Sequence, residues 1–319
     1  MRITFLFVFL ITLIPFCSMA QMESIFLGVE SGTGAKAPKA SVRGVGAMYD
    51  KNLSQNQLMV SVPVSGDEYG QWSSSVYLNR YHFSVDEKLP KDQVEVPAEL
   101  SNLQFGLSYR QKLEEQKYWM LSAQVGSASD QVFSQSDVDT VNINAVYAGD
   151  VKPEESWIWL VNYSNNRPIL NNLPLPGFAY VYTPNPKFRG IFGFPFLFTK
   201  WNFAENWNLN FSILGFTAVK TELSYQVFGP VQAYVVYDHN QQGFFRRDRS
   251  ESDKRFFYDE KKMAIGIRSP LNALLFSDLQ VGKSWDRHLF EAQSVAKQGE
   301  NRLFLDAAWY AQFSLAARF

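Results

Sequence analysis

Seven charged residues lie in segments where apolar and polar residues alternate, and each occupies the polar side of the alternation. They are Arg110, Lys220, Glu222, Lys262, Arg268, Asp306 and Arg318. Charged side chains that line the interior of a β-barrel can select solutes by the sign of their charge. Because both signs are present, the same residues could instead form salt bridges that fill a narrow barrel. The sequence leaves both interpretations open.

Three histidines, His82, His239 and His288, could take part in acid–base chemistry. Asp86 and Asp238 lie close enough in sequence to two of them to permit a hydrolase at the barrel rim. No spacing matches a nucleophile motif, so we expect no enzyme and no catalytic residue. Solvent-exposed loop histidines are the ordinary explanation of the pattern.

The most basic run spans residues 246–249, with the sequence Arg-Arg-Asp-Arg. It could hold lipopolysaccharide phosphates through charge-assisted hydrogen bonds, or it could belong to a solvated loop. The chain has a single cysteine, Cys17, no metal-ligand spacing and no glycine loop for phosphate. We therefore expect no metal and no cofactor.

The elements that position these residues are best seen in the last segment, residues 303–319. Its odd-numbered residues are all apolar, and most of the even-numbered ones are polar or small. This period of two predicts a β-strand with one face in an apolar medium. Trp309 and Phe319 lie on the apolar face, and ten residues of tilted strand span roughly 25 Å, the height of a bilayer's apolar band.

Similar alternation recurs upstream, and the segments are separated by polar or Gly/Pro-containing connections. The segments are 40–49, 58–64, 72–85, 103–110, 119–126, 141–147, 157–163, 178–182, 188–198, 207–213, 219–227, 231–237, 263–267 and 274–285. A meander of hairpins has this repeat. With the last segment the count is fifteen, or sixteen if 188–198 divides at Phe194-Pro195, or fourteen if one weak hairpin near the N-terminus is lost. Because the bacterial barrels have an even number of strands, we predict fourteen, with a range of twelve to sixteen.

The predicted fold is therefore an all-β, antiparallel, up-and-down transmembrane β-barrel spanning residues 40–319. A row of aromatic residues, Phe192, Phe194, Phe196 and Phe198, is predicted to face lipid. Short turns such as Gly229-Pro230 and long loops such as 238–255 alternate, and outer-membrane barrels place the short turns in the periplasm. The final strand of a soluble sandwich or lipocalin-like barrel is the alternative explanation for the last segment.

The first twenty residues predict a signal peptide. Arg2 precedes a short apolar run, and Ser18 and Ala20 place cleavage between Ala20 and Gln21. Residues 21–39 then form a periplasmic N-terminal arm. A lipoprotein lipidated at Cys17 is disfavoured, because the preceding Phe16 is bulky for that recognition site.

Composition indicates which partners and which type of membrane protein are expected. The net charge is −1 and no basic stripe is present, so nucleic acid is not an expected partner. The mean hydropathy of −0.19 is too polar for a membrane protein built from helices, but it suits a barrel, in which only alternate residues face lipid. We expect the protein in the outer membrane, in contact with its lipid and lipopolysaccharide.

The chain resembles a family of functionally uncharacterised outer-membrane barrel proteins common in Bacteroidota, similar in outline to barrels of aromatic-compound pathways. The resemblance lies in the terminal strand and in the run from LPLPGFAYVYTPNP through GFPF to the 207–227 hairpin. The family supplies no catalytic residues. The resemblance implies the barrel-assembly machinery as a partner, with Trp309, Phe313, Leu315 and Phe319 as its assembly signal.

The predicted function is a passive pore or channel for small solutes, of which the sequence identifies none. The alternatives are a closed barrel whose outer loops bind a ligand or serve a structural role and, more remotely, an outer-membrane enzyme.

Overall fold

The computed structural model describes residues 41–49, 53–113, 117–149, 152, 154–215, 218–297, 299 and 301–318, with the side chains of 41–49 and 318 excepted. The predicted signal peptide, its cleavage between Ala20 and Gln21, the N-terminal arm and Phe319 lie outside the described residues.

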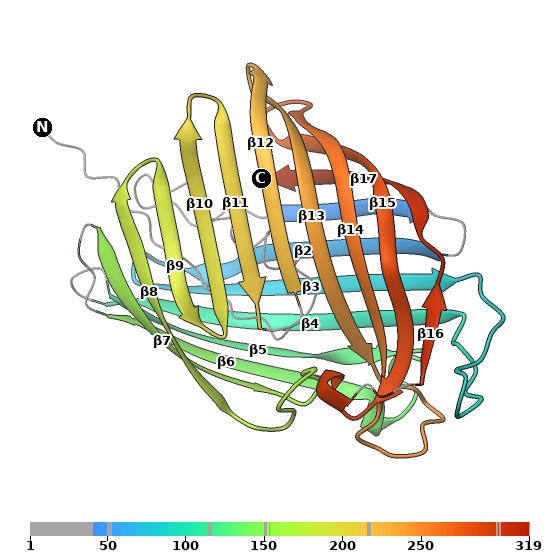
Figure 1. Cartoon of the computed structure of the whole chain (residues 1–319). Coiled ribbons are helices and arrows are strands. Elements are labelled where there is room, and N and C mark those ends of the chain that lie inside the picture. The colour runs from blue at the N-terminus through green and yellow to red at the C-terminus, as the bar shows by residue number, and fades with distance from the viewer. Residues whose placement is uncertain are drawn as a thin grey trace, which may run out of the picture.

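Seventeen strands make up one antiparallel sheet in the described part of the chain (Figure 1). They are β1 (Ser41–Tyr49), β2 (Leu53–Gly66), β3 (Gly70–Phe83), β4 (Glu99–Lys112), β5 (Tyr118–Ser129), β6 (Asp139–Gly149), β7 (Glu155–Ser164), β8 (Leu175–Asn185), β9 (Phe188–Phe194), β10 (Phe196–Ala204), β11 (Trp207–Leu214), β12 (Ala218–Phe228), β13 (Val231–Phe244), β14 (Arg255–Pro270), β15 (Leu275–Ala292), β16 (Arg302–Leu305) and β17 (Ala308–Arg318). Two short 3₁₀ helices, η2 (Ser136–Val138) and η3 (Val295–Lys297), lie in loops. No helix among these residues is long and apolar enough to cross a membrane.

The sheet closes on itself, because β1 pairs with both β2 and β17. β16 and β17 both pair with β15 and follow one another along the same position in the ring. We call each such position a stave, so the seventeen strands form a ring of sixteen staves. The prediction of an antiparallel up-and-down barrel is confirmed. The predicted number of fourteen is too low, and the observed number is the upper limit of the predicted range.

The additional hairpin forms at Phe194-Pro195, where the sequence allowed a division. β9 ends at Phe194, β10 begins at Phe196, and the two strands pair antiparallel, since a proline cannot donate to a continuing ladder. The turn changes which residues face outwards: Phe194 is 53% exposed, whereas Phe196 is 2% exposed and packs inside. The prediction of a continuous lipid-facing row is correct for Phe192 and Phe194 and wrong for Phe196 and Phe198.

The last segment also departs from strict alternation, at one place. In β17, Trp309, Phe313 and Leu315 are exposed and Ser314 is buried, as predicted. Upstream the order reverses, because Leu305 is 9% exposed and Phe304 is 64% exposed.

A bulge causes this reversal. Asp286 of β15 has a φ of 50°, in the left-handed region that an Asp tolerates better than most residues. Opposite it, the last stave is interrupted at Asp306 and Ala307, and the pairing resumes unchanged on both sides. At this interruption, the residues that face inwards change from even-numbered to odd-numbered positions in both strands. Leu305 therefore points into the core.

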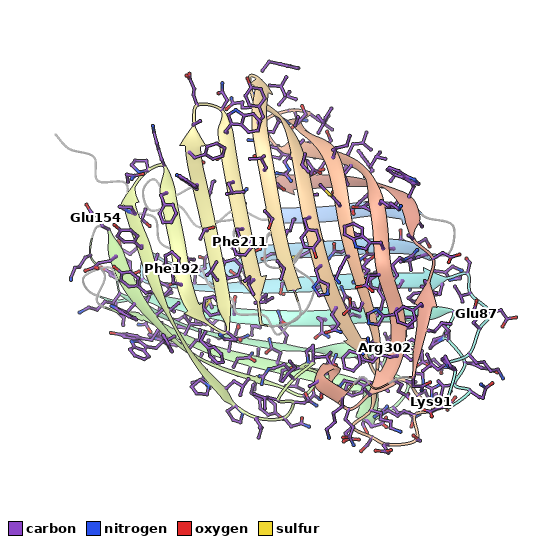
Figure 2. The ribbon with its side chains drawn as sticks, viewed as in Figure 1. Glu87, Lys91, Glu154, Phe192, Phe211 and Arg302 are labelled. Carbon is purple, nitrogen blue, oxygen red and sulfur yellow. The ribbon has the colours of Figure 1, made fainter. Side chains whose placement is uncertain are left out.

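The barrel has two different ends. Figure 2 shows Glu87, Lys91 and Arg302 at the end where long connections gather, and Glu154 at the opposite end. We call these the long-loop end and the short-turn end. Between them the outward face exposes mainly apolar side chains, including Leu107, Leu121, Val125, Ile143, Trp159, Val161, Ile265, Leu279, Val281 and Phe313. An apolar outer band of this kind matches the lipid-facing surface of a membrane barrel.

Candidate functional site

The interior wall formed by β4–β7 carries uncharged polar side chains. They are Asn102, Gln104, Ser122, Gln124, Thr140, Asn142, Asn144, Asn162 and Ser164, and we call them the amide wall. Its members bond one another: Gln104 Nε2 donates to Thr140 Oγ1 at 2.7 Å, and Asn162 Nδ2 donates to the Oδ1 atoms of Asn142 and Asn144 at 2.8 and 2.7 Å. Buried amides with partners of this kind satisfy their hydrogen bonds without a charge.

The facing wall, formed by β12–β15, carries ionised groups. Arg268 donates to both carboxylate oxygens of Glu222 at 3.2 Å and to Asp278 at 2.9 Å, and its guanidinium lies 4.9 Å from the ring centre of Tyr234. Tyr234 donates in turn to Asp278. These contacts join four neighbouring strands through one guanidinium, whose fork geometry suits two carboxylates at once.

A second charged pair lies on the same wall, nearer the long-loop end. Lys262 Nζ is 2.7 Å from Glu260, and both side chains are buried. Glu260 also accepts from Tyr258 at 2.9 Å and from Ser284 at 3.1 Å. Removing one partner from a pair with this burial would leave an uncompensated charge, which is strongly destabilising.

The structure brings together four of the seven predicted interior charges: Lys220, Glu222, Lys262 and Arg268 lie on the inner face of β12–β14. Arg110 lies apart, stacked at 4.5 Å over the ring of Tyr118.

The remaining two predicted interior charges do not join the cluster. Asp306 is not on the inner wall, because it lies exposed in the interruption between β16 and β17, where its carbonyl accepts from Arg287 at 3.1 Å. The side chain of Arg318 lies outside the described part.

Sequence reasoning missed two acidic partners, Asp278 and Glu260. Asp278 stands on the polar side of its alternating segment, and its pairing with Arg268 depends on the register between β14 and β15. Glu260 lies just before residue 263, where the return strand was predicted to begin. Like Lys262, it has an even number and therefore falls on the same face of β14. That parity is the signal that could have revealed it.

The histidines are not arranged for hydrolysis. His239 Nε2 lies 3.1 Å from Asp259, while the neighbouring Asp238 belongs to the inward-facing set of β13. His288 Nδ1 lies 3.3 Å from the carbonyl oxygen of Asp286, and its ring lies beside those of Phe290 and Phe304. In the described part of the chain, no serine hydroxyl bonds a histidine, and no cluster of His, Cys, Asp and Glu could hold a metal ion.

The basic run at 246–249 is held within the protein. Arg246 pairs with Glu291 at 3.0 Å, Arg247 donates to Gln131 at 2.9 Å, and Arg249 donates to the Asp137 carboxylate at 2.8 Å. These arginines therefore connect the run to β15 and to the β5–β6 loop. Arg247 and Asp248 are exposed, so the loop is solvated while its arginines have partners within the protein.

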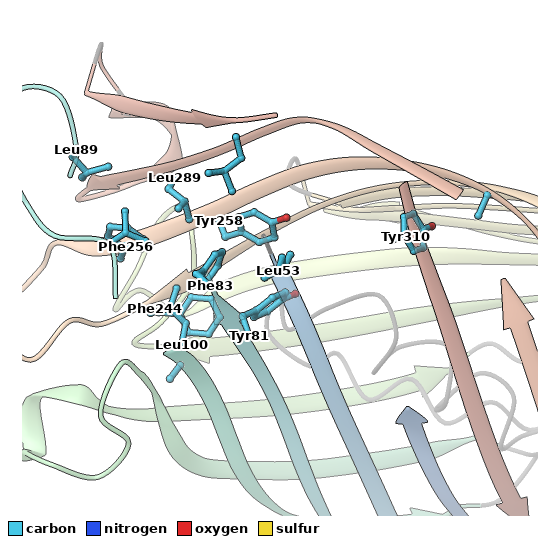
Figure 3. Packing of buried hydrophobic residues seen from close by; sticks show 14 of the residues in the cluster. Leu53, Tyr81, Phe83, Leu89, Leu100, Phe244, Phe256, Tyr258, Leu289 and Tyr310 are labelled. Carbon is cyan, nitrogen blue, oxygen red and sulfur yellow. The ribbon is translucent and has the colours of Figure 1, made fainter. Parts of the chain in front are cut away.

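The interior is closed at the long-loop end by an apolar cluster (Figure 3). Its side chains come from both walls and from the 84–98 connection: Leu53, Tyr81, Phe83, Leu89, Val96, Leu100, Phe244, Phe256, Tyr258 and Leu289 are all buried. The Tyr81 ring meets Phe244 and Tyr258 edge-on, with centroids 6.0 and 5.4 Å apart. Side chains from opposite sides of the ring thus pack as in the core between two sheets.

Two fully buried arginines brace the same end. Arg167 donates to the carbonyls of Leu170, Leu173 and Asn162 and to the side chain of Asn162. Arg255 donates to the carbonyls of Arg167 and Gln293. Burial lowers the pKa of the Arg167 guanidinium. These bonds occupy the terminal guanidinium nitrogens of both arginines, and they connect the β7–β8 loop to β14 and the β15–β16 loop.

A small polar cavity of about 20 Å³ lies between the amide wall and β13. Its lining includes Gln104, Asn142, Asn166, Gln242 and Gly243. Two buried polar atoms of that lining, Gln242 Nε2 and Asn166 Oδ1, have no hydrogen-bond partner in the part of the chain that the structure describes. The volume is sufficient for a water molecule, which could bond both atoms.

Comparison with known proteins gives distant likenesses. No protein-family model matches this chain, and no curated protein matches it. Among solved structures, an outer membrane channel from Pseudomonas putida F1 is 11% identical, with 91% of this chain and 100% of that chain covered and a TM-score of 0.37. The Pseudomonas putida toluene transporter TodX is 7% identical, with 89% and 90% covered and a TM-score of 0.38.

A porin variant from Rh. blastica is 8% identical, with 88% and 99% covered and a TM-score of 0.32. These neighbours are outer-membrane channels and porins. At such values their activities cannot be transferred to this chain.

Proposed function

We propose that this protein is an outer-membrane β-barrel channel for small solutes. The observation that carries the proposal is a closed ring of sixteen staves with an apolar outer face and a polar, charged inner face. A barrel that only filled itself with side chains would not need sixteen staves, because about eight already give a packed interior.

The two interior walls suggest what such a channel would pass. The amide wall offers donors and acceptors without net charge, and the facing wall offers ions of both signs that are paired with each other. This arrangement favours small polar solutes over strongly charged ones. The buried cluster at the long-loop end implies that conduction requires that end to open.

A planar-bilayer conductance measurement on the purified, folded protein tests the proposal. We expect ohmic steps, and we expect Lys220→Glu, which changes an inner-face charge, to shift ion selectivity towards cations. Lys187→Glu is the matched control, because Lys187 is exposed in the β8–β9 turn. Absence of conductance in heat-modifiable, folded protein would reject the channel.

The location is tested separately. The proposal includes export through cleavage between Ala20 and Gln21 and contact with outer-membrane lipid and lipopolysaccharide. It also includes assembly by the barrel-assembly machinery reading Trp309, Phe313, Leu315 and Phe319, and membership of the uncharacterised Bacteroidota barrel family. We expect the protein in the outer-membrane fraction and faster migration on gels when it is not heated. Recovery from the soluble periplasm would contradict this.

The second candidate function is a closed barrel that binds a ligand or has a structural role through its outer loops. The observation that favours it is the apolar cluster that seals the long-loop end. The conductance measurement separates the two, since a permanently closed barrel gives no steps under any condition.

A further inference from the structure

Strands from opposite sides of the ring are directly bonded at the long-loop end. β5 and β13 are eight staves apart in a ring of sixteen, so they lie across the barrel from each other. The amide of Phe245, just after β13, donates to the carbonyl of Ala128 at 2.7 Å, and Ser129 and Phe245 form a parallel bridge. A short stretch of chain therefore crosses the mouth of the barrel.

This stretch, residues 245–249, is called the strap. Beyond the backbone bridge, its far side is held by polar contacts. The amide of Arg247 donates to Asp130 at 2.9 Å. The Arg249 guanidinium donates to the Asp137 carboxylate at 2.8 Å, although its side chain is only 2% exposed. The same guanidinium lies 4.9 Å from the ring centre of Phe245.

The strap is tied to the far wall by few interactions compared with a strand in the barrel. β13 and β14 exchange a continuous ladder from Gln232 to Phe244. The strap instead has one isolated bridge, the contacts of Arg247 with Asp130 and Gln131, and the contacts of Arg249 with the carbonyl and carboxylate of Asp137. Segments held by few interactions open locally before the body of a protein does.

The packing beneath the strap is also incomplete. Gln242 and Gly243, which lead into it, line the small polar cavity against the amide wall. Among the described residues, Gln242 Nε2 and Asn166 Oδ1 have no hydrogen-bond partner, and the cavity that they line has room for a water molecule. Separating a hydrated polar joint exposes less apolar surface than separating a dry one. One side of the strap's seat is therefore hydrated, whereas release of the other side also exposes Phe245, which is only 4% exposed, and Ala128 of the apolar cluster.

We propose that the strap is a gate: its release from Ala128, Asp130 and Asp137 opens the interior to the side of the long loops. The proposal rests on the proposed channel function and assigns its regulation to the contact between β5 and residues 245–249. The Arg249–Asp137 pair is its latch, because it joins two oppositely charged side chains, one on the strap and one in the β5–β6 loop.

Hydrogen exchange measures strap opening whether or not the barrel conducts. We expect amides of the strap to exchange at least tenfold faster than those of β12 and of β13 up to Asn240. Arg249→Ala should accelerate strap exchange by roughly another tenfold, because it removes a charge-assisted bond. Arg302→Ala is the control, since Arg302 lies at the same end and its guanidinium donates to the Gly299 carbonyl of the adjoining β15–β16 loop, away from the strap. Strap exchange as slow as that of the barrel body would overturn the gate.

A reversible crosslink tests the same contact by conductance. Ser129→Cys with Phe245→Cys places thiols at bridge partners, and the predicted mature chain has no other thiol. We expect the oxidised form to lose conductance and the reduced form to regain it. Leu107→Cys with Ala123→Cys, paired on the outer face of β4 and β5, should conduct equally in both states.

The outcomes separate the two proposals. Conductance that is equal in the oxidised and reduced strap variant rejects the gate and leaves the channel intact. Fast, latch-dependent exchange without conductance in any form rejects the channel and supports a mobile strap. Slow exchange without conductance rejects both.

Discussion

The backbone amide of Phe245 donates to the carbonyl of Ala128 at 2.7 Å, although the two residues lie at the ends of strands on opposite sides of the barrel. Sixteen staves arranged as a round cylinder would leave an open channel between these strands. The ring instead brings the two strands together at the long-loop end, and Figure 1 shows β10–β15 crossing over β2–β6. Near the long-loop end the barrel therefore packs like two facing sheets, which explains its apolar cluster.

The first prediction tests which face of β17 meets lipid. Phe313→Arg should destabilise the barrel by roughly 2–4 kcal/mol if Phe313 lies near the bilayer midplane. Ser314→Arg should cost less, because Ser314 faces the interior and pairs in register with Asp278, a carboxylate that an arginine could contact. The measurement is the yield of heat-modifiable protein from each variant. Equal yields, or the reverse order, would contradict the lipid-facing assignment.

The alternation of Phe313 and Ser314 also explains how much of the fold could be predicted from the sequence. Each strand has one face in an apolar medium and one face inside, and a period of two records this directly. The same alternation placed Lys220, Glu222, Lys262 and Arg268 on the polar face of their strands, where the structure also has them. Local patterning therefore predicts the positions of most strands and the direction of their side chains, but it gave fourteen strands where the ring has sixteen.

What could not be predicted depends on contacts between distant segments or on single backbone angles. The Arg249–Asp137 pair joins residues 112 positions apart through irregular loops that have no periodic signal. The partner of Arg268 depends on the register between strands, and the reversal at Leu305 depends on a bulge at Asp286. Neither leaves a pattern that one strand can show alone.

The second prediction tests the hairpin at Pro195. Phe196→Ala should cost about 3 kcal/mol, because it removes a buried ring from the interior cluster that includes Leu214 and Ala218. Phe194→Ala is the matched comparison, since its ring points outwards and leaves no interior cavity. Urea unfolding of the refolded barrel in lipid measures both. Similar losses for the two variants would indicate that both rings face outwards, as in one continuous strand over 188–198.

The third prediction concerns the guanidinium between two carboxylates. Arg268→Gln leaves Glu222 and Asp278 without their cation, so the local charge changes from −1 to −2. We expect a loss of about 2 kcal/mol, less than for a fully buried pair because the Arg268 side chain is 30% exposed.

Unfolding midpoints and reversal potentials in a salt gradient measure the two effects, and the reversal potential should shift towards cation selectivity. Adding Glu222→Gln to Arg268→Gln should recover much of the stability. A double variant that is as unstable as the sum of two independent losses would contradict the direct pairing.

The last prediction tests the reversal of alternation between β16 and β17. Strict alternation from Phe313 backwards would put Leu305 outside and Phe304 inside, whereas the bulge at Asp286 places Leu305 in the core and Phe304 outside. Leu305→Arg should therefore lower the yield of folded protein strongly, because it buries a charge among apolar side chains of the long-loop end.

Phe304→Arg should be tolerated much better, since its side chain can remain in water or at the bilayer interface. Heat-modifiable yield, compared at equal expression, measures the difference. If Phe304→Arg is the more damaging change, the last stave alternates without interruption, and the inward turn of Leu305 towards the apolar cluster is wrong.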